Sequence, residues 1–150
     1  MSDWYPHVTV AVVVERDGRY LMVEERDKFS GEMVFNQPAG HLERDETLEQ
    51  GALRECLEET GWQVELTGVL GVSTSASHGN GITYVRTTFC ANALNEVAGA
   101  TLDPDIHAVH WLSYEEITAN SARMRSPLVI ASIDRQRLGK QYSMDLIFTA

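Results

Sequence analysis

The sequence predicts an α+β fold in which a mixed β-sheet packs against helices. Segments typical of strands and of helices alternate irregularly along the chain and do not repeat the βαβ unit of a doubly wound parallel sheet. The 150 residues, of which 43% are apolar and 23% are charged, suit one globular domain. We therefore expect a single domain that spans residues 1–150.

The chain begins with a predicted β-hairpin. Residues 8–14 (VTVAVVV) and 19–25 (RYLMVEE) are rich in β-branched and other apolar side chains, and Asp17-Gly18 suits the positive φ angles of a tight turn. The first strand scarcely alternates between apolar and polar residues, so we expect it to be buried on both faces. A short strand, MVFNQ, follows and ends at Pro38.

The segment from Thr47 to Thr60 is the clearest predicted helix. Thr47 and Gln50 form a T-x-x-Q capping box, and Gly61 stands where a left-handed residue ends a helix. Helical spacing predicts an apolar stripe that packs on the core. Its members are Leu48, Ala52, Leu53 and Cys56.

The remainder of the chain predicts three strands and then two helices. The strands cover residues 62–72, 82–93 and 108–112. Ser113 and Glu116 form a second capping box, which begins a helix near residue 114. Ser126-Pro127 begins a last helix, which stops at Gly139.

The charge balance limits the partners that the chain can bind. Its 12 Lys and Arg residues against 22 Asp and Glu residues give a net charge of −10, which disfavours nucleic-acid binding through a broad basic surface. The first residues lack a signal-peptide pattern, and no apolar run nears the roughly 18 residues of a membrane span. Cys56 and Cys90 lie in apolar surroundings without a Cys-x-x-Cys spacing. We therefore expect a cytoplasmic protein that binds neither nucleic acid nor membranes.

Three glutamates of the predicted 47–60 helix share one face. Glu55, Glu58 and Glu59 fall within an arc of roughly 100° when each residue advances the helix by about 100°. A solvated acidic face is one explanation, because repulsion costs only a few tenths of a kcal/mol per exposed pair. A metal site is the other explanation.

The residues around these glutamates favour the metal site. Glu43 and Glu46 precede the helix, and Gly40 allows close backbone approach there. Arg54 stands four residues before Glu58, where it can orient a carboxylate. Carboxylate oxygens select Mg²⁺ or Mn²⁺ over zinc, so the pattern predicts a site for one of these ions.

The spacing of these residues resembles a known family motif. Residues 40–62 match the Nudix box, G-x5-E-x7-R-E-U-x-E-E-x-G-U, with Cys56 and Trp62 at the U positions that are usually aliphatic. The segments FNQPAGHLE and RSPLV are similar to the NudJ branch of this family. The resemblance implies a Nudix-type α/β/α sandwich with a mixed β-sheet.

The same resemblance implies a hydrolase with a metal-binding active site. Under it, Glu55, Glu58 and Glu59 bind Mg²⁺, for which Mn²⁺ can substitute, with a main-chain carbonyl of Gly40 or Ala39 as an additional ligand. Arg54 orients the carboxylates, and it joins the three glutamates in the expected catalytic set. Glu43 and Glu46 are weaker candidate ligands, because the first box glutamate of the family often supports the arginine.

The general base stays open at this point. Branches of the family use either a box glutamate or an acid on a distant loop to activate water. The candidates are Glu58 inside the box and Glu96, Asp103 and Asp105 outside it. Asp105 is the most interesting of the distant acids, because it precedes the segment IHAVHWLS, although an ordinary loop position explains these acids as well.

Candidate substrate contacts lie outside the box. Arg26 and Arg86 can bind phosphate, Phe35 can stack on a ring, and Asn36 and Gln37 can hydrogen-bond a ring edge. Tyr84 and Trp4 are further candidates for stacking. Each of these residues also has a structural explanation, such as core packing, an ion pair or a polar strand end.

We expect a Mg²⁺-dependent hydrolase of small organic di- and triphosphates. Nucleoside di- and triphosphates and thiamine-type pyrimidine diphosphates are the candidate substrates, and the enzyme is a monomer or homodimer. Residues 77–79 carry neither the proline associated with ADP-ribose hydrolases nor the tyrosine associated with dinucleoside polyphosphate hydrolases. A Nudix hydrolase for another nucleoside diphosphate derivative and a non-catalytic nucleotide-sensing module are the alternatives. An isoprenoid diphosphate isomerase is disfavoured, because Cys56 should be buried.

Overall fold

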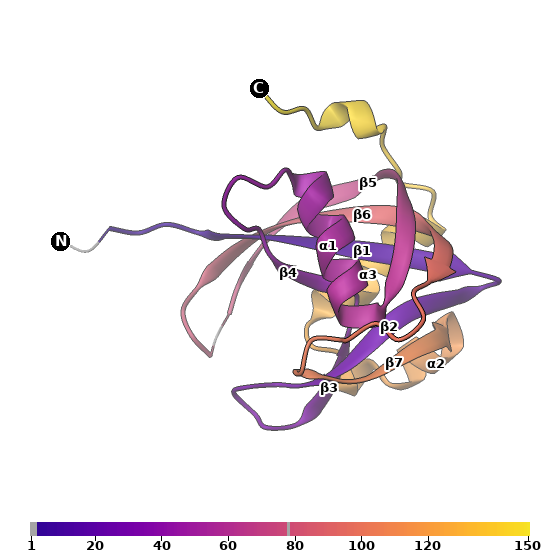
Figure 1. The fold of residues 1–150 in the computed structure, drawn as a ribbon. Coiled ribbons are helices and arrows are strands. Elements are labelled where there is room, and N and C mark those ends of the chain that lie inside the picture. The colour runs from indigo at the N-terminus through magenta and orange to yellow at the C-terminus, as the bar shows by residue number, and fades with distance from the viewer. Residues whose placement is uncertain (1–2, 78) are drawn as a thin grey trace.

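The structure is a computed structural model that describes residues 3–77 and 79–150. Residue 78, in the segment that distinguishes other Nudix hydrolases, lies outside the described residues. The described residues form seven strands, three α-helices and two 3₁₀ helices (Figure 1). In chain order these are β1 (His7–Arg16), β2 (Arg19–Arg26), β3 (Met33–Asn36), β4 (Ala39–His41), α1 (Leu48–Thr60), β5 (Trp62–Ala76), β6 (Thr83–Glu96), β7 (Ile106–Ser113), α2 (Tyr114–Ala119), η1 (Ser121–Arg123), α3 (Pro127–Arg137) and η2 (Met144–Leu146).

The sheet is mixed and divides into two groups of strands. In the first group, β1 lies parallel to β6 and antiparallel to β4, and β5 pairs with β6 on its other side. In the second group, β2 lies between β3 and β7 and is antiparallel to both. The groups join where β1 and β2 pair, at Glu15↔Tyr20 and Arg16↔Arg19. Because this pairing is confined to the turn end of the hairpin, β4 and not β2 borders the earlier part of β1.

Helices cover both faces of the sheet. One core lies between the sheet and α1, where Val10, Val12 and Val14 of β1 pack with Ala52 and Cys56. A second core lies on the opposite face, where other side chains of the sheet pack against α2 and α3. Figure 1 shows α1 in front of the sheet and α3 behind it. The α/β/α sandwich with a mixed sheet, predicted from the sequence, is confirmed.

Most of the predicted elements are also confirmed. Asp17 and Gly18 have φ angles of 53° and 77°, as the hairpin turn requires. The capping boxes of α1 and α2 are both formed, and Ser126 caps α3. β1 is buried on both faces over residues 10–14, and β5 and β6 extend beyond their predicted ends.

One prediction about local structure is wrong, and one strand was not predicted. The sequence predicts Leu53 in the core stripe of α1, but this residue is 40% exposed, because Gly51, Ala52 and Cys56 are the residues that α1 turns toward the sheet. The predicted end of the preceding strand before Pro38 is confirmed, because β3 ends at Asn36, but β4 (Ala39–His41), which pairs with β1, was not predicted. Among the described residues, no helix is both long and apolar enough to cross a membrane.

Candidate metal and active site

Arg54 of α1 is the centre of the charged network that the sequence predicted. Its Nε and Nη2 atoms donate to the two carboxylate oxygens of Glu46 at 2.7 and 2.8 Å. Its Nη1 atom donates to Glu55 Oε1 at 2.8 Å and to Glu58 Oε2 at 3.1 Å. Its Nη2 atom also donates to the main-chain oxygen of His41 at 3.0 Å. One guanidinium therefore fixes two acids of the helix face and ties them to β4.

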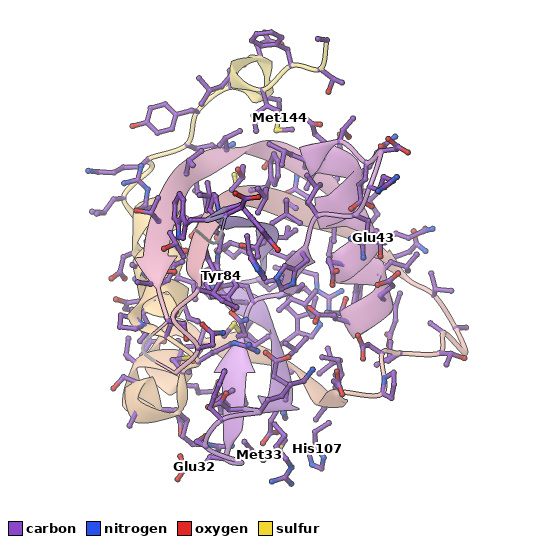
Figure 2. The ribbon with its side chains drawn as sticks, turned by 90° about the vertical axis from the view of Figure 1, so that its left-hand side faces the viewer. Glu32, Met33, Glu43, Tyr84, His107 and Met144 are labelled. Carbon is purple, nitrogen blue, oxygen red and sulfur yellow. The ribbon has the colours of Figure 1, made fainter. Side chains whose placement is uncertain are left out.

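Glu46 serves as the anchor of Arg54. Its side chain is 11% exposed, and the bidentate hydrogen bond from Arg54 lowers the pKa of its carboxyl group. A Cβ atom at Gly51 would lie 2.9 Å from Glu46 Oε1, so a glycine at this helix position leaves room for the carboxylate. Glu43 is exposed beside α1, 3.5 Å from Arg54 (Figure 2). This arrangement favours the supporting role that the resemblance suggested for Glu46.

Gly40 lies directly against the carboxylate of Glu55. β4 brings it there by pairing with β1, where Gly40 is opposite Val10. A Cβ atom at Gly40 would lie 2.2 Å from Glu55 Cδ, which is closer than real contacts allow. Burial raises the pKa of Glu55, and the hydrogen bond from Arg54 opposes that rise. The first glycine of the box is therefore needed for close packing against this acid.

Glu59 is the most buried acid of the helix face. Its residue is 7% exposed, and its Oε1 atom accepts a hydrogen bond from the main-chain nitrogen of Ala39 at 2.8 Å. Burial, together with the nearby charges of Glu25, Glu55 and Asp103, raises the pKa of Glu59 to about 9. In the absence of a cation, this carboxyl group therefore holds a proton at neutral pH. A cation at the site would stabilise its ionised form instead.

Glu25 and Asp103 extend the acidic face beyond the helix. Glu25, at the end of β2, is 8% exposed and accepts a hydrogen bond from Arg125 Nη1 at 2.7 Å. The main-chain nitrogen of Asp103 donates to the main-chain oxygen of Glu58 at 2.9 Å, which fixes the β6–β7 loop beside α1. Asp103 was a minor candidate in the sequence, and Glu25 was missed. The sequence feature that could have identified Glu25 is a charged residue at the end of a buried strand.

Asp105 and Glu96, the distant acids that the sequence offered as general bases, lie apart from the acid network of α1. Asp105 is exposed and 3.9 Å from Lys28, and its main-chain nitrogen donates to Asp103 Oδ1 at 2.9 Å. Glu96 is exposed at the end of β6, opposite Trp62 of β5. Neither residue is among the charges that raise the pKa values of Glu55 and Glu59, whereas Asp103 is. Among these distant acids, the loop conformation therefore favours Asp103 and disfavours Asp105 and Glu96.

Arg86 and Gln37, two candidate substrate contacts, are buried and bonded to each other. Arg86 Nη2 donates to Gln37 Oε1 at 2.8 Å and to Ser132 Oγ at 3.3 Å, and Arg86 Nε donates to Thr88 Oγ1 at 3.0 Å. Gln37 Nε2 donates to the main-chain oxygen of Val129 at 2.6 Å. Burial lowers the pKa of Arg86 to about 10. This network joins the sheet to α3, which favours a structural role for both residues.

The remaining substrate candidates differ in accessibility. Phe35 is 6% exposed, and the guanidinium of Arg123 lies 4.5 Å from its ring centroid, so its position favours core packing. Arg26 is exposed and donates to the main-chain oxygen of Gly31 within its own hairpin. Asn36 is 8% exposed, and its Oδ1 atom has no hydrogen-bond partner among the described residues. Of Phe35, Arg26 and Asn36, it is therefore Asn36 whose buried side-chain oxygen can still accept a hydrogen bond.

The acids suit a hard divalent cation by their chemistry. The metal-donor atoms of these acids are carboxylate oxygens. Gly40 packs so closely against Glu55 that the backbone beside the acids has no space for a side chain. Over residues 3–77 and 79–150, no three His, Cys, Asp or Glu side chains already converge as a closed ligand set. Arg54 holds the carboxylates of Glu55 and Glu58 instead. The donor chemistry therefore suits a divalent cation, while among the described residues the carboxylates are held by Arg54 and are not gathered as a ligand set.

Comparisons with known proteins identify the family. A sequence model of the NUDIX domain matches residues 5–131. The phosphatase NudJ of Escherichia coli strain K12 is 37% identical over 142 residues, which cover 95% of this chain and 90% of that protein. A NUDIX hydrolase from Nitrosomonas europaea is 38% identical and has a TM-score of 0.94, covering 97% of this chain and 98% of that one. A MutT NUDIX hydrolase from Burkholderia pseudomallei is 22% identical and shares the fold, with a TM-score of 0.72 over 88% of this chain and 98% of that one.

The family match and the similarity to these proteins define a hydrolase that acts on pyrophosphate bonds. The chain belongs to the Nudix hydrolase family, and it is a homologue of the NudJ phosphatases. Members of this family generally use a divalent metal ion and act on small molecules. The predictions of the family, the enzyme class and the fold are confirmed.

Proposed function

We propose that this chain is a Mg²⁺-dependent Nudix hydrolase that cleaves phosphoanhydride bonds of small organic di- and triphosphates. Mn²⁺ can replace Mg²⁺ in the proposal, because both ions prefer oxygen ligands. The main support is the acid face of α1, where Arg54 orients Glu55 and Glu58 beside the buried Glu59. In this proposal, Glu55, Glu58, Glu59 and a main-chain carbonyl of Gly40 hold the ion.

The residues of the chain have separate roles in the proposed reaction. A bound divalent ion would supply positive charge against the substrate phosphates and would favour ionisation of the attacking water. Arg54 keeps the carboxylates in position, and Glu59 would be ionised with a cation bound. Glu58, whose side chain is 49% exposed, is the most accessible of the three acids and is the proposed general base, with Asp103 as the alternative.

The proposed bond changes are those of a hydrolysis. A water oxygen attacks one phosphorus atom, and the base accepts the proton that the water loses. The bond between that phosphorus and the bridging oxygen breaks, and the bridging oxygen leaves with the other phosphate. The acidic face alone would repel a polyphosphate, so a bound cation is needed before the substrate can approach.

We propose nucleoside di- and triphosphates and thiamine-type pyrimidine diphosphates as the substrate classes. The support is the homology to proteins named phosphatase NudJ, which suggests release of inorganic phosphate. The proposal also includes a single domain, a monomer or homodimer, a cytoplasmic location and no nucleic-acid partner. The net charge of −10 supports the last of these.

A phosphate-release panel tests the proposed function directly. Purified protein is incubated with nucleotides, sugar nucleotides and thiamine intermediates, and the products are identified to locate the broken bond. We expect turnover that requires added Mg²⁺ or Mn²⁺. Full turnover in excess chelator would contradict the metal-dependent mechanism. Binding of nucleotides without hydrolysis of any panel member would favour the nucleotide-sensing module, and release of nucleoside monophosphate from sugar nucleotides alone would favour the other hydrolase class.

A further inference from the structure

Two consecutive glutamates of β2 are held by two arginines from the segment that precedes α3. Glu24 Oε2 accepts a hydrogen bond from Arg123 Nη2 at 2.9 Å, and Glu25 Oε1 accepts one from Arg125 Nη1 at 2.7 Å. Side chains alternate along a strand, so the two glutamates lie on opposite faces of β2. The two ion pairs therefore have different surroundings, although they are neighbours in the sequence.

Other side chains occupy the remaining contacts of the Glu24–Arg123 pair. Glu24 Oε1 lies 2.9 Å from His110 Nε2, so both carboxylate oxygens have partners. The Arg123 guanidinium lies over the ring of Phe35, 4.5 Å from its centroid. A carboxylate with two partners and a guanidinium on an aromatic face form a structural contact between β2, β7 and η1.

The Glu25–Arg125 pair, in contrast, lies beside the acidic face. Glu25 is 8% exposed. Burial of Glu59 is the main cause of its raised pKa, and the negative charge of Glu25 is the next cause that raises it. The Arg125 side chain is 50% exposed, and among the described residues its guanidinium has one hydrogen-bond partner, Glu25. Burial lowers the pKa of His41, on β4 next to the box glycine, and the charges of His7 and Arg125 lower it further. Arg125 is therefore a cation with unused N–H donors near the proposed metal ligands.

The backbone determines which face Arg125 occupies. Met124 forms an isolated parallel bridge with Phe35, and the main-chain nitrogen of Arg125 donates to the main-chain oxygen of Phe35 at 2.9 Å. The segment thus adds to the free edge of β3. The Met124 side chain packs in the core on the α3 side, so alternation along the edge turns Arg125 to the other face.

Asn36 of β3 lies on the same face as Glu25. Asn36 pairs with Val23 of β2, and Val23 and Glu25 are two residues apart on one strand face. Asn36 is 8% exposed, and its Oδ1 atom is buried without a hydrogen-bond partner in the part of the chain that the structure describes. A buried amide with an unmet hydrogen bond indicates a place where a ligand or water completes the contacts. This observation is independent of the charge of Arg125.

We propose that Arg125 binds a phosphate group of the substrate and that Glu25 positions it. The proposal rests on the proposed function. A guanidinium can keep one N–H on a carboxylate while others bind non-bridging phosphate oxygens. Arg125 thus supplies positive charge for the substrate beside a face whose other guanidinium, that of Arg54, is bonded to carboxylates, and Asn36 completes the same substrate-binding surface. None of this requires Arg125 to take part in proton transfer.

Replacement of Arg125 tests the proposal, with Arg123 as the matched control. We expect Arg125→Ala to raise KM about 10- to 100-fold, because a charge-assisted hydrogen bond is lost, while kcat stays within about threefold. The concentration of Mg²⁺ that gives half-maximal activity should not change. Arg123→Ala should lower Tm by a few degrees and leave KM unchanged. An unchanged KM in Arg125→Ala, or an equal rise in Arg123→Ala, would overturn the proposal.

Glu25 is tested as a positioning residue by two variants. Glu25→Gln keeps an oxygen that can accept from Arg125, so we expect its KM to stay closer to that of the wild type than the KM of Glu25→Ala. The double variant Glu25→Ala/Arg125→Ala should have the KM of Arg125→Ala alone, because both changes remove one function. Additive effects on KM would overturn the positioning role. Arg125→Lys and Arg125→Gln give the same KM comparison where the alanine variant does not fold.

Binding of inorganic pyrophosphate separates this proposal from the proposed function. Isothermal titration with pyrophosphate and Mg²⁺, over a time in which no orthophosphate is released, measures the phosphate contact separately from turnover. Weaker binding by Arg125→Ala, with normal binding by Arg123→Ala, supports the assignment even if the wild type hydrolyses no member of the substrate panel. Equal binding by wild type and Arg125→Ala overturns the assignment even if the wild type is an active hydrolase.

Discussion

Arg54 and Arg86 are both largely enclosed by the protein, but their partners differ in charge. Arg54 donates to Glu46, Glu55 and Glu58, all of which are acids. Arg86 donates to an amide oxygen and to two hydroxyl groups. The pKa of Arg54 is raised by its acids, whereas the pKa of Arg86 is lowered by burial.

This difference indicates which region is prepared for a charged ligand. Around Arg54 the acids outnumber the cation, so a further cation can enter and be balanced by the excess negative charge. Around Arg86 the neutral partners hold the guanidinium between the sheet and α3. Buried polar residues therefore do not by themselves mark the site. The number of charges in each network distinguishes the two regions.

Glu58→Gln should give the largest functional loss in the acid network. Loss of a general base lowers rates by roughly 10²- to 10⁴-fold, so we expect kcat to fall by that factor. The fold should persist, because the change removes negative charge from a crowded face and affects an exposed side chain. Steady-state phosphate release and thermal melting measure the two effects. Undiminished phosphate release by a folded Glu58→Gln variant would contradict the role of Glu58, and Asp103→Asn would then test the alternative base.

Replacement of each arginine by methionine compares the two networks directly. Arg54→Met leaves enclosed carboxylates without their counter-charge, so we expect a loss of about 3 to 5 kcal/mol in the free energy of unfolding. Arg86→Met leaves one amide oxygen and hydroxyl groups without a donor, so the expected loss is about 1 to 3 kcal/mol. Urea unfolding in excess chelator measures both.

Added Mg²⁺ sharpens this comparison. It should restore part of the stability of Arg54→Met, because the cation replaces the missing positive charge, and it should not restore the stability of Arg86→Met. Equal recovery in both variants would contradict the distinction between the two networks. A raised KM in a well-folded Arg86→Met variant would instead support the substrate contact that the sequence suggested for Arg86.

Gly40→Ala should disturb the acid network through packing. The new Cβ atom would lie 2.2 Å from Glu55 Cδ, so the carboxylate must move. A displacement of about 1 Å at a catalytic group can cost about 10²-fold in rate, and we expect kcat to fall by about that factor. Gly68→Ala is the control, because its Cβ atom would meet the exposed side chain of Gln141, away from the acids. A similar kcat in the two variants would contradict the packing role of Gly40.

The sequence was most informative where a regular element fixes side-chain positions. The capping box located the start of α1, and the four-residue spacing of Arg54 and Glu58 predicted the contact that Arg54 Nη1 makes at 3.1 Å, because a helix repeats its geometry. β4 was missed because Ala39–His41 has no strand pattern of its own and owes its structure to β1. Leu53 was misplaced because its helical position alone does not show where the sheet ends.

The parts of the site that depend on tertiary structure could not be predicted. Asp103 rather than Asp105 lies near the acids, because one main-chain hydrogen bond to Glu58 fixes the loop. Glu25 joins them because the fold brings its charge close enough to raise the pKa of Glu59, a proximity that no sequence spacing encodes. The same is true of Arg125, which is 100 residues from its partner Glu25.

Glu59 should make the stability of the metal-free protein depend on pH. Its pKa is about 9 in the folded state against an ordinary value of 4.5, so between these values the folded state holds a proton that the unfolded state has lost. The free energy of unfolding should therefore fall as pH rises through this window, with a contribution of about 1.4 kcal/mol per pH unit from this residue.

Glu59→Gln isolates that contribution. The glutamine side chain of this variant cannot ionise, and its amide oxygen can still accept from the main-chain nitrogen of Ala39, so the slope should flatten while the fold remains. Urea unfolding in chelator at several pH values from roughly 5.5 to 8.5, which lie inside this window, gives both slopes. Mg²⁺ binding to the wild type should release a proton at neutral pH, since the cation requires the ionised carboxylate. Identical slopes in the two proteins would show that Glu59 is already ionised, and its acid network would then carry more negative charge than Arg54 can balance.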